Sequence, residues 1–439
     1  MLDENERGAV CEKPLRVLFI VHECRVRRFT EAMEYACWYE GAFAFYGGDR
    51  VQVGIAYEAW GDLPGSPHPG GPSSTGRPSQ DLGITYYPLE VNLQLGATGP
   101  EWEAARRALI DVVDRFRPDI IQCFGSEWPH AAIAEDVDVP VVVHMMGFLN
   151  IYYPSIDMAV GRSGGAPKTA PWRAAIRKLL FWRRNHGDAV SVLEQNAAFE
   201  RRVMRANRFF LGRTEWDKNI VKYYAPGSRY FEVSEPIRFP FLEEAGSWRY
   251  HLTGTLRLFT LASADDRKGL EIILRTAKLL KELVGIEFEW RIAGHKEGFD
   301  RFERRCGIRH DEVNIHLLGM LEAEDVVDEL KGADLCIHAS IIDNSPRAVC
   351  ESQLVGCPTI SSNVGGVPQL VEHGVTGFLY PYNEPHTLAF LIANLYGQRE
   401  QLTAESKAAS SLARRRHDPK TIVERMLDVY KEVIASYEK

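Results

Sequence analysis

Short apolar runs alternate with helical patterns along nearly the whole chain. Runs rich in β-branched and aromatic residues are typical of strands. They are Arg16–Ile20, Val51–Ile55, Ile84–Tyr87, Asp119–Cys123 and Val139–Val143 in the first half, and 256–262, 287–293, 313–317, 335–340, 357–362 and 376–381 in the second. Helical patterns separate several of them, for example Glu101–Arg117, which Pro118 ends. This alternation indicates parallel sheets with both faces covered, so the predicted fold class is α/β.

Size and charge favour an enzyme over a nucleic-acid-binding protein. The chain has 439 residues, of which 45% are hydrophobic, enough for two domains with separate cores. Its net charge of -8 gives no reason to expect nucleic acid as a partner. The eight cysteines form no C-x-x-C pair, so we expect reduced thiols and no metal site. The polar N-terminus does not resemble a signal peptide and no long apolar run is present, so we expect a cytoplasmic protein.

Two carboxylates, Asp343 and Glu351, stand eight positions apart across the predicted start of a helix. Asp343 follows strand 335–340, and open α/β sheets bind ligands at the carboxyl ends of their strands. A carboxylate there can accept hydrogen bonds from ribose hydroxyls. The pattern favours a nucleotide-sugar site. The alternative is a loop carboxylate at Asp343 and a solvated helix residue at Glu351.

The residues between these carboxylates fit a helix start. Ser345 is a suitable N-cap, Pro346 fits the first turn, and Gly356 fits the C-terminal stop. The free N–H groups of Ser345 to Ala348 would carry a partial positive charge suited to a phosphate or a sugar hydroxyl.

The next strand, 357–362, leads into a loop that contains adjacent glycines, Gly365 and Gly366. Glycines at a strand end allow a close backbone approach to a ligand or a positive φ. A short helix at 369–372 and the strand 376–381 complete this unit.

Residues 313–392 resemble the donor-binding half of the family 4 retaining glycosyltransferases. That family carries an acidic residue, seven intervening residues and a glutamate, followed by a Gly-Gly-Val/Ile-Pro-Glu-like loop. Asp343 stands at the first acidic position, where Glu is more usual, and Glu351 at the second. Asn344–Pro346 stand where Gly-Phe-Gly is common. The resemblance implies the GT-B fold, with two Rossmann-like domains whose parallel sheets face each other across a cleft.

The resemblance also implies a reaction. It is the transfer, with retention, of a sugar from a nucleoside-diphosphate sugar (UDP or GDP) to a hydroxyl acceptor, without a cofactor or a bound metal. The expected catalytic residues are Asp343, Glu351, Lys268 and His144. The expected donor-binding residues are Arg267, Lys268, Gly294, Gly319, Asp343, Asn344, Ser345, Pro346, Arg347, Ala348, Glu351, Gly365 and Gly366.

The cations expected at the donor diphosphate are Arg267 and Lys268, which precede an amphipathic helix at 270–283. The alternative is a solvated basic pair that balances Asp265 and Asp266. The family has an arginine near the end of the preceding strand, where this chain has residues 261–263, and Arg267 is the candidate substitute. Gly294 would approach the nucleotide, or it marks no more than a tight turn.

The N-terminal half should bind the acceptor. The expected residues there are His22, His144, Gly147, Arg213 and Glu215. The strand that ends at Gly147 resembles a family strand ending in His-Gly, but Met146 replaces the histidine, and His144 shares the face of Met146. A core histidine is the alternative for His144. The first strand-to-helix loop, with His22 and Arg25, lacks the Gly-Gly of relatives.

The expected domains follow from these assignments. They are an acceptor-binding domain at 1–235 with a flexible loop at 61–80, a linker at 236–255, a nucleotide-sugar-binding domain at 256–415, and a C-terminal helix at 416–439 that packs back on the first domain.

A basic aromatic segment, 168–184, lies in a stretch without acidic residues from Met158 to Gly187. Such a helix can lie in a membrane interface and attract anionic lipid. The alternative is a helix that packs its apolar residues on its own domain.

Two other classes stay open for the whole protein. A GT-B epimerase or a pyridoxal-phosphate-dependent phosphorylase would share the fold. A non-catalytic donor-binding or assembly subunit would fit the Met146 replacement and the missing strand-end arginine. The favoured role is a transferase in glycan, glycolipid, polysaccharide or natural-product biosynthesis.

If 168–184 contacts a membrane at the inner face, the protein should sediment with anionic liposomes, and added salt should release it because the attraction is electrostatic. Sedimentation assays measure this directly. Absence of binding at low salt would contradict the prediction.

Overall fold

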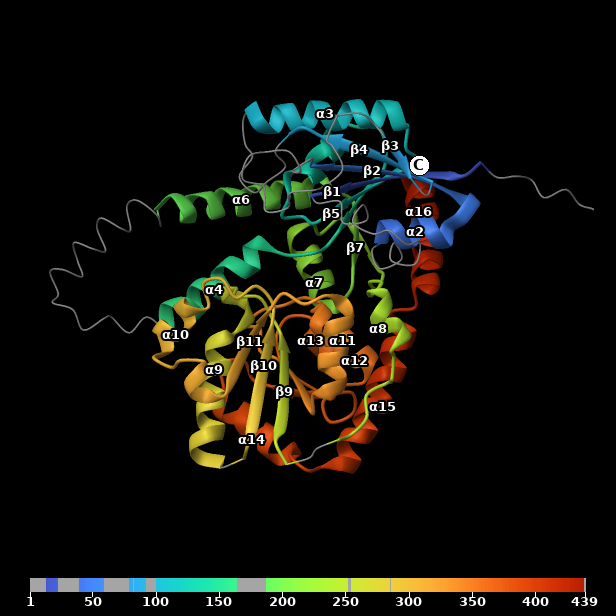
Figure 1. The fold of residues 1–439 in the computed structure, drawn as a ribbon. Helices are drawn as coiled ribbons and strands as arrows, with labels where there is room; N and C mark the ends of the chain where they lie inside the picture. The colour runs from blue at the N-terminus through green and yellow to red at the C-terminus, as the bar shows by residue number, and fades with distance from the viewer. Residues whose placement is uncertain are drawn as a thin grey trace, which may run out of the picture.

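Two sheets, one in each half of the chain, organise the structure (Figure 1). The structure is a computed structural model that describes residues 13–22, 39–58, 79–81, 83–91, 100–163, 187–251, 254–284 and 286–437. The basic segment 168–184 and Arg25 lie outside these residues, as does most of the 61–80 loop. The α/β class with two parallel sheets is confirmed.

The first sheet has eight strands in the order β3-β4-β2-β1-β5-β6-β7-β8. The strands are β1 (Leu15–Val21), β2 (Val51–Glu58), β3 (Ser79–Asp81), β4 (Ile84–Leu89), β5 (Ile120–Phe124), β6 (Val141–His144), β7 (Phe209–Gly212) and β8 (Arg229–Glu232). All neighbours are parallel except β3, which pairs antiparallel with β4. Residues 79 and 80, at the end of the predicted 61–80 loop, belong to β3.

Helices cover both faces of the first sheet. They are α2 (Tyr39–Gly47), α3 (Pro100–Phe116), the 3-10 helix η3 (Pro129–Glu135), α4 (Leu149–Ser163), α6 (Gly187–Ala206) and α7 (Glu215–Tyr224). One core cluster joins β1 to α3 and α6, and the other joins β1 to α2 and to the last helix of the chain, α16 (Pro419–Tyr437). The α16 side chains Val423, Met426 and Tyr430 are completely buried in that cluster.

The second sheet has six parallel strands in the order β11-β10-β9-β12-β13-β14. The strands are β9 (Leu256–Leu261), β10 (Phe288–Ala293), β11 (Ile315–Gly319), β12 (Leu335–His338), β13 (Thr359–Ser362) and β14 (Phe378–Tyr380). The surrounding helices are α8 (Phe239–Glu243), η5 (Asp266–Lys268), α9 (Leu270–Leu279) with a π-helical turn (Leu280–Val284), α10 (Asp300–Cys306), α11 (Ala323–Gly332), α12 (Arg347–Val355), α13 (Val367–Leu370), α14 (Pro385–Leu395) and α15 (Arg399–Arg416).

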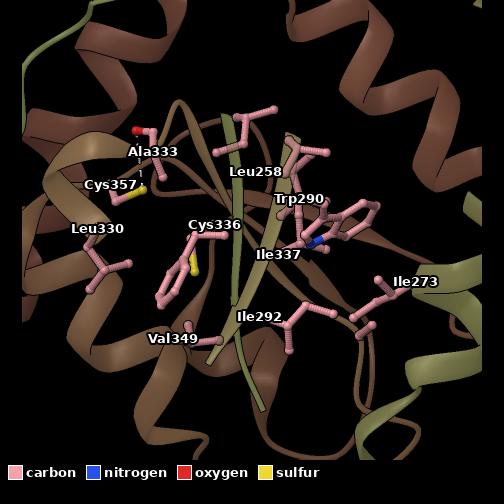
Figure 2. Close-up of a cluster of buried hydrophobic side chains, with 14 of the residues drawn as sticks. Leu258, Ile273, Trp290, Ile292, Leu330, Ala333, Cys336, Ile337, Val349 and Cys357 are labelled. Carbon is pink, nitrogen blue, oxygen red and sulfur yellow. Dashed lines mark hydrogen bonds between the residues drawn. The ribbon is translucent and has the colours of Figure 1, made fainter. Parts of the chain in front are cut away.

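A continuous apolar core surrounds the second sheet (Figure 2). Trp290 is fully buried beside β9, and its indole N–H donates a hydrogen bond of 3.0 Å to the Thr260 hydroxyl. Burial of its large apolar surface stabilises the fold, while the hydrogen bond satisfies its one polar group. This core fixes the strand ends that carry the candidate site.

The helix α12 begins differently from the expectation. Its N-cap is Pro346, and no side chain caps it. The prediction of Ser345 as the N-cap was wrong, because the Ser345 hydroxyl donates instead to Glu235, at 2.7 Å. The predicted stop is confirmed, since Gly356 takes a left-handed conformation with φ of 90°. The short helix expected at 369–372 lies two residues earlier, as α13.

The helix α15 buries a carboxyl group, that of Glu405, which is 2% exposed. Its Oε1 accepts a hydrogen bond of 3.2 Å from the Thr359 amide, and no described residue contacts its Oε2 by a hydrogen bond. Burial raises the pKa of Glu405 from 4.5 to about 8. The folded protein therefore holds a proton on Glu405 that the unfolded chain releases above its ordinary pKa.

The pH dependence of stability should report this proton. Because the folded pKa is the higher one, the stabilisation is complete below pH 4.5 and is lost as the pH rises towards about 8. The free energy of unfolding should fall by about 1.4 kcal/mol per pH unit from this group. Glu405→Gln should flatten that part of the slope, measured by urea unfolding, whereas Glu400→Gln, at an exposed position of the same helix, should leave it unchanged. Equal slopes in the two variants would contradict the assignment.

Candidate functional site

The candidate site lies where loops follow neighbouring parallel strands of the second sheet. β9, β12 and β13 are adjacent in that sheet, so their carboxyl ends share one edge. The loops after them are 262–269, 339–346 and 363–366. They bring Lys268, Asp343 and the two adjacent glycines to one place.

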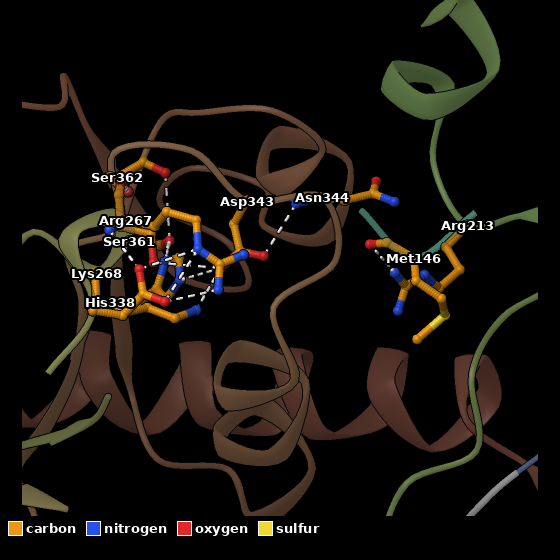
Figure 3. A network of polar contacts seen from close by, with 11 residues as sticks. Met146, Arg213, Arg267, Lys268, His338, Asp343, Asn344, Ser361 and Ser362 are labelled. Atoms are coloured by element: carbon orange, nitrogen blue, oxygen red, sulfur yellow. Dashed lines mark hydrogen bonds and ion pairs between the residues drawn. The ribbon is translucent and has the colours of Figure 1, made fainter. Parts of the chain in front are cut away.

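Asp343 is the centre of a charged cluster (Figure 3). Its Oδ2 lies 2.9 Å from the Lys268 ammonium group, 3.4 Å from His338 Nε2 and 3.3 Å from the Ser340 hydroxyl. Burial opposes the ionisation of Asp343, but the nearby Lys268 charge and the His338 contact outweigh it and hold the pKa of Asp343 well below its usual range. Asp343 is therefore an anion at neutral pH, with 17% of its side chain exposed.

His338 orients this carboxylate and was missed by the sequence analysis. It is the last residue of β12, and its Nδ1 lies 2.8 Å from the Ser361 hydroxyl on β13. Burial lowers the pKa of His338, although Asp343 opposes the shift. The available signal was its position at a strand end five residues before Asp343.

The adjacent glycines serve the packing of the Asp343 loop. Gly365 has a φ of 53°, and a Cβ there would lie 1.8 Å from the Asp343 carbonyl oxygen. A Cβ on Gly366 would lie 2.2 Å from the Asn344 carbonyl oxygen and 2.7 Å from the Thr214 hydroxyl oxygen. Both glycines therefore allow backbone segments to meet closely, and this holds Asp343 in place.

Arg267 is engaged by its own neighbour. Its guanidinium group binds the Asp265 carboxylate through Nε and through Nη2, the latter at 2.9 Å. It also lies over the ring of Tyr152, in α4 of the first domain, at 5.4 Å from the centroid. Arg267 thus links the two domains through a cation–π contact beside Lys268.

The two other expected glycines differ in their surroundings. A Cβ on Gly294 would lie 2.5 Å from the Ala262 carbonyl, so backbone packing at the β10 end requires glycine there. This favours the tight-turn alternative. Gly319 has a positive φ of 80° and open space around it.

Glu351 is buried in the second turn of α12. It is 1% exposed, which excludes the alternative of a solvated helix residue. Its Oε1 accepts a hydrogen bond of 2.9 Å from Arg238 Nε, while its Oε2 has no hydrogen-bond partner among the described residues. Burial raises the pKa of Glu351, and Arg238 opposes the shift.

A buried carboxylate, that of Glu235, joins the domains. Glu235 is 1% exposed and lies 2.8 Å from Arg213 Nη1 and 3.4 Å from Arg347 Nε. Burial alone would raise its pKa, but the two arginines lower it. Arg213 follows β7, and Arg347 is the first residue of α12, with Pro346 before it and Ala348 after it. The expected residues Arg213, Ser345 and Arg347 are therefore brought together, around a glutamate that the sequence analysis did not select.

Asn344 makes a second junction. Its amide nitrogen donates 2.8 Å to Asp217, and its side-chain oxygen accepts 2.6 Å from the Thr214 hydroxyl. Thr214 and Asp217 form the capping box that begins α7. Asn344 is buried, so it contacts the first domain in this structure.

His144 lies in the core of the first domain. It is completely buried, its ring lies beside Phe124 and Tyr39, and its Nδ1 is 3.2 Å from Gln122 Nε2. Burial lowers the pKa of His144 to about 3, so the ring is neutral. These contacts favour the alternative of a core histidine.

The other acceptor candidates lie at different places. His22, after β1, stacks on Trp128 with 4.1 Å between ring centroids and lies 3.3 Å from Glu58. Glu215 is exposed at the start of α7 and pairs with Lys218 at 2.6 Å.

Glu127 is a half-buried carboxyl group that the sequence analysis missed. It follows β5, and the Gly147 amide donates to its Oε2 at 3.4 Å. Burial raises the pKa of Glu127 to about 7, with the nearby Glu200 charge adding to the shift. Its position just after a predicted strand, like that of Asp343, was the available signal.

Neither a metal cluster nor a membrane-spanning helix is found in the parts of the chain that the structure describes. No group of three or more His, Cys, Asp or Glu side chains there could hold a metal ion. In the same residues, no helix combines the length and the apolar character needed to cross a bilayer.

Comparison with known proteins places a family match on this domain. Residues 252–411 match the family model described as glycosyl transferases group 1. The amylovoran biosynthesis glycosyltransferase AmsK of Erwinia amylovora is 25% identical over 223 residues, which cover 48% of this chain and 53% of AmsK. A D-inositol 3-phosphate glycosyltransferase of Thermobispora bispora is 31% identical over 245 residues, covering 50% and 54%. The alignments thus span about half the length of these two relatives.

Solved structures share the whole fold at low identity. Sucrose-phosphate synthase of Thermosynechococcus elongatus has a TM-score of 0.68 and 12% identity, with 96% of this chain and 100% of that chain covered. HepE of Anabaena, in complex with UDP-glucose, has a TM-score of 0.60 and 14% identity, with 95% and 100% covered. The chain has the GT-B fold of these proteins.

Substitution of Gly365, with Gly374 as the control, tests the packing of the Asp343 loop. Gly365→Ala should destabilise the protein more than Gly374→Ala, because both positions have positive φ but only Gly365 faces an atom within 3.0 Å. We expect roughly 1–2 kcal/mol for the control and roughly 1–3 kcal/mol more for Gly365. Urea unfolding of both variants measures the difference. Equal losses of unfolding free energy would show that the Asp343 loop can move away from the new side chain without destabilising the protein.

Proposed function

We propose that the protein is a retaining glycosyltransferase that moves a sugar from a nucleoside-diphosphate sugar to a hydroxyl acceptor. The observation that carries this proposal is that the family-matched segment and the candidate site residues lie in the same domain. The segment that matches the group 1 glycosyl transferases, 252–411, is the one that holds Lys268 against Asp343 at the strand ends of one sheet and carries Glu351 buried on the helix that follows.

Lys268 is the proposed contact to the donor diphosphate. An ammonium group has three N–H donors, and the hydrogen bond to Asp343 uses one of them. The remaining donors can bind phosphate oxygens while the ion pair keeps the side chain in position. The start of α12 adds a partial positive charge, since the first turn of a helix has unsatisfied amides.

The two carboxylates, Glu351 and Asp343, are the proposed contacts to the ribose and to the transferred sugar of the donor. Glu351 is the proposed partner of the ribose hydroxyls, and its buried Oε2, which has no hydrogen-bond partner among the residues that the structure describes, supports that role. Asp343 is the proposed partner of hydroxyls on the transferred sugar. His338 positions Asp343, because its Nε2 lies 3.4 Å from the carboxylate, while burial lowers the pKa of its ring and so favours the neutral imidazole.

The mechanism follows the resemblance to retaining enzymes of this fold. The acceptor hydroxyl attacks the anomeric carbon from the leaving-group side, the bond to the diphosphate oxygen breaks, and the proton passes to the leaving phosphate. The protein mainly orients the reactants and stabilises the charge that develops on that phosphate. Lys268 suits this role, and we propose that no metal is required.

The names of related proteins suggest the substrates. HepE binds UDP-glucose, and AmsK is named for amylovoran biosynthesis. We therefore propose a UDP-sugar donor and a saccharide acceptor, in polysaccharide biosynthesis. A non-catalytic donor-binding subunit is the rival, because Met146 stands where relatives have histidine and its carbonyl lies 3.4 Å from Arg213 Nη2.

Sugar nucleotides should stabilise the protein against heat, since a ligand that binds the native state raises its Tm. UDP-glucose, other UDP-hexoses and GDP-mannose are the first probes, with release of the nucleoside diphosphate as the activity readout. EDTA should leave that activity unchanged. Binding without any release of diphosphate would favour the non-catalytic subunit, and no binding by any probe would contradict the proposal.

Lys268→Gln should lower kcat roughly 100-fold, because it removes the charge that stabilises the leaving diphosphate. Glutamine keeps a hydrogen-bond donor for Asp343, so folding should be retained. The matched control is Lys331→Gln, which breaks a surface pair with Glu244 at 3.3 Å in the same domain. Similar activity in both variants would exclude Lys268 from the donor site.

A further inference from the structure

The Glu127 carboxyl group has spare hydrogen-bonding capacity. The Gly147 amide donates to it over a long 3.4 Å, and no other described residue outside its own backbone donates a hydrogen bond to it. An ionised carboxylate has about four acceptor sites. The neighbouring Glu200 shows the contrast, because it accepts hydrogen bonds from Ser126, Leu149 and Asn150 and so holds the local structure together.

Gly147 and Tyr152 connect Glu127 to the donor side of the domain junction. A Cβ on Gly147 would lie 3.0 Å from Glu127 Oε1 and 3.2 Å from Tyr152 Cε2, so both side chains flank this glycine. The charges of Asp343 and Glu127 both act on Tyr152, where they add to burial in raising its pKa. The Tyr152 ring also lies under the guanidinium group of Arg267, next to Lys268 in sequence.

The absence of a side chain at Gly147 lets the Glu127 carboxyl and the Tyr152 ring both pack closely against this position. Any larger residue would press on the Glu127 carboxyl and on the Tyr152 ring. Glu127 therefore lies on the first domain, near the place where Tyr152 contacts Arg267 of the second domain.

We propose that Glu127 binds and orients the acceptor hydroxyl that receives the sugar. This inference rests on the proposed transferase function and deepens it. The ionised carboxylate accepts a hydrogen bond from the acceptor O–H, which fixes the oxygen lone pair towards the anomeric carbon. The new C–O bond forms as the bond to the diphosphate breaks, and the proton passes to the leaving phosphate.

The charges around Glu127 indicate the class of acceptor. The groups that face it are Glu200 of α6, Arg213 after β7 and Tyr152 of α4. Arg213 is already paired with the buried Glu235 at 2.8 Å. Two carboxyl groups, with the nearest arginine engaged, disfavour an anion, so the reacting end of the acceptor is an uncharged saccharide hydroxyl and carries no phosphate.

The test uses the pH dependence of transfer. Burial and Glu200 place the pKa of Glu127 at about 7, so the ionised, binding form increases as the pH rises through neutrality. In the wild type, kcat/KM should rise about tenfold per pH unit below that pKa. The acceptor probes are water, read as hydrolysis of UDP-glucose or of whichever sugar nucleotide binds, and a set of methyl hexopyranosides.

Glu127→Gln should remove this rise and lower kcat/KM at least about tenfold near pH 8, while the Kd of the sugar nucleotide stays unchanged. Glu127→Asp should restore a pH-dependent rise, because it keeps a carboxyl group. The matched control is Glu135→Gln, at the end of η3. Glu135 is a surface glutamate that pairs with Arg202, so this variant should behave like the wild type.

The outcomes separate the two proposals. If Glu127→Gln keeps the wild-type pH profile and rate while the donor is still cleaved, the role of Glu127 is wrong and the transferase function stands. If the wild type neither binds nor cleaves a sugar nucleotide, the transferase function fails and this inference fails with it. A fall in Tm of Glu127→Gln with no restored pH dependence in Glu127→Asp would assign Glu127 a structural role and overturn the proposal.

Discussion

The buried carboxylate of Glu235 is a central contact between the two domains. It receives Arg213 from the first domain and Arg347 and Ser345 from the second, at distances of 2.8, 3.4 and 2.7 Å. A buried charge without partners would be strongly unfavourable, so both domains must supply their groups together. Because Arg347 and Ser345 flank the start of α12, the same contact orients the helix that carries Glu351. The geometry of the candidate site thus depends on the domain junction as much as on either sheet.

The charged groups on the two sides of that junction differ. On the second domain, Lys268 and Asp343 form an ion pair that His338 and Ser340 hold in place. On the first domain, Glu127 and Glu200 form an acidic pair of which only Glu200 is fully occupied by structural hydrogen bonds. Under the proposed function, the donor diphosphate would contact Lys268 on the second domain, and the acceptor hydroxyl would contact Glu127 on the first.

Local residue patterns were sufficient to predict much of the fold and part of the candidate site. The strands of the second sheet lie within about two residues of the predicted runs because most of them are short, buried apolar stretches, and Asp343 was placed correctly after β12. Ser345 was misassigned because its hydroxyl contacts Glu235, which is 110 residues away in sequence and invisible to a local capping rule. The strands β7 and β8 were not among the predicted runs, and each is four residues long. Glu127 follows a predicted strand but belongs to no motif, and only the fold brings Gly147 and Tyr152 near it.

The position of α16 has a consequence for the order in which the protein is built. This last helix supplies part of the core beside β1, although about 400 residues of chain separate the two. During synthesis this core cluster thus stays incomplete until α16 has been made. Apolar side chains that pack on α16, such as Phe43 beside the Tyr430 ring with 5.3 Å between ring centroids, lack that partner until then, so the core of the N-terminal domain is completed after the C-terminal domain has been synthesised.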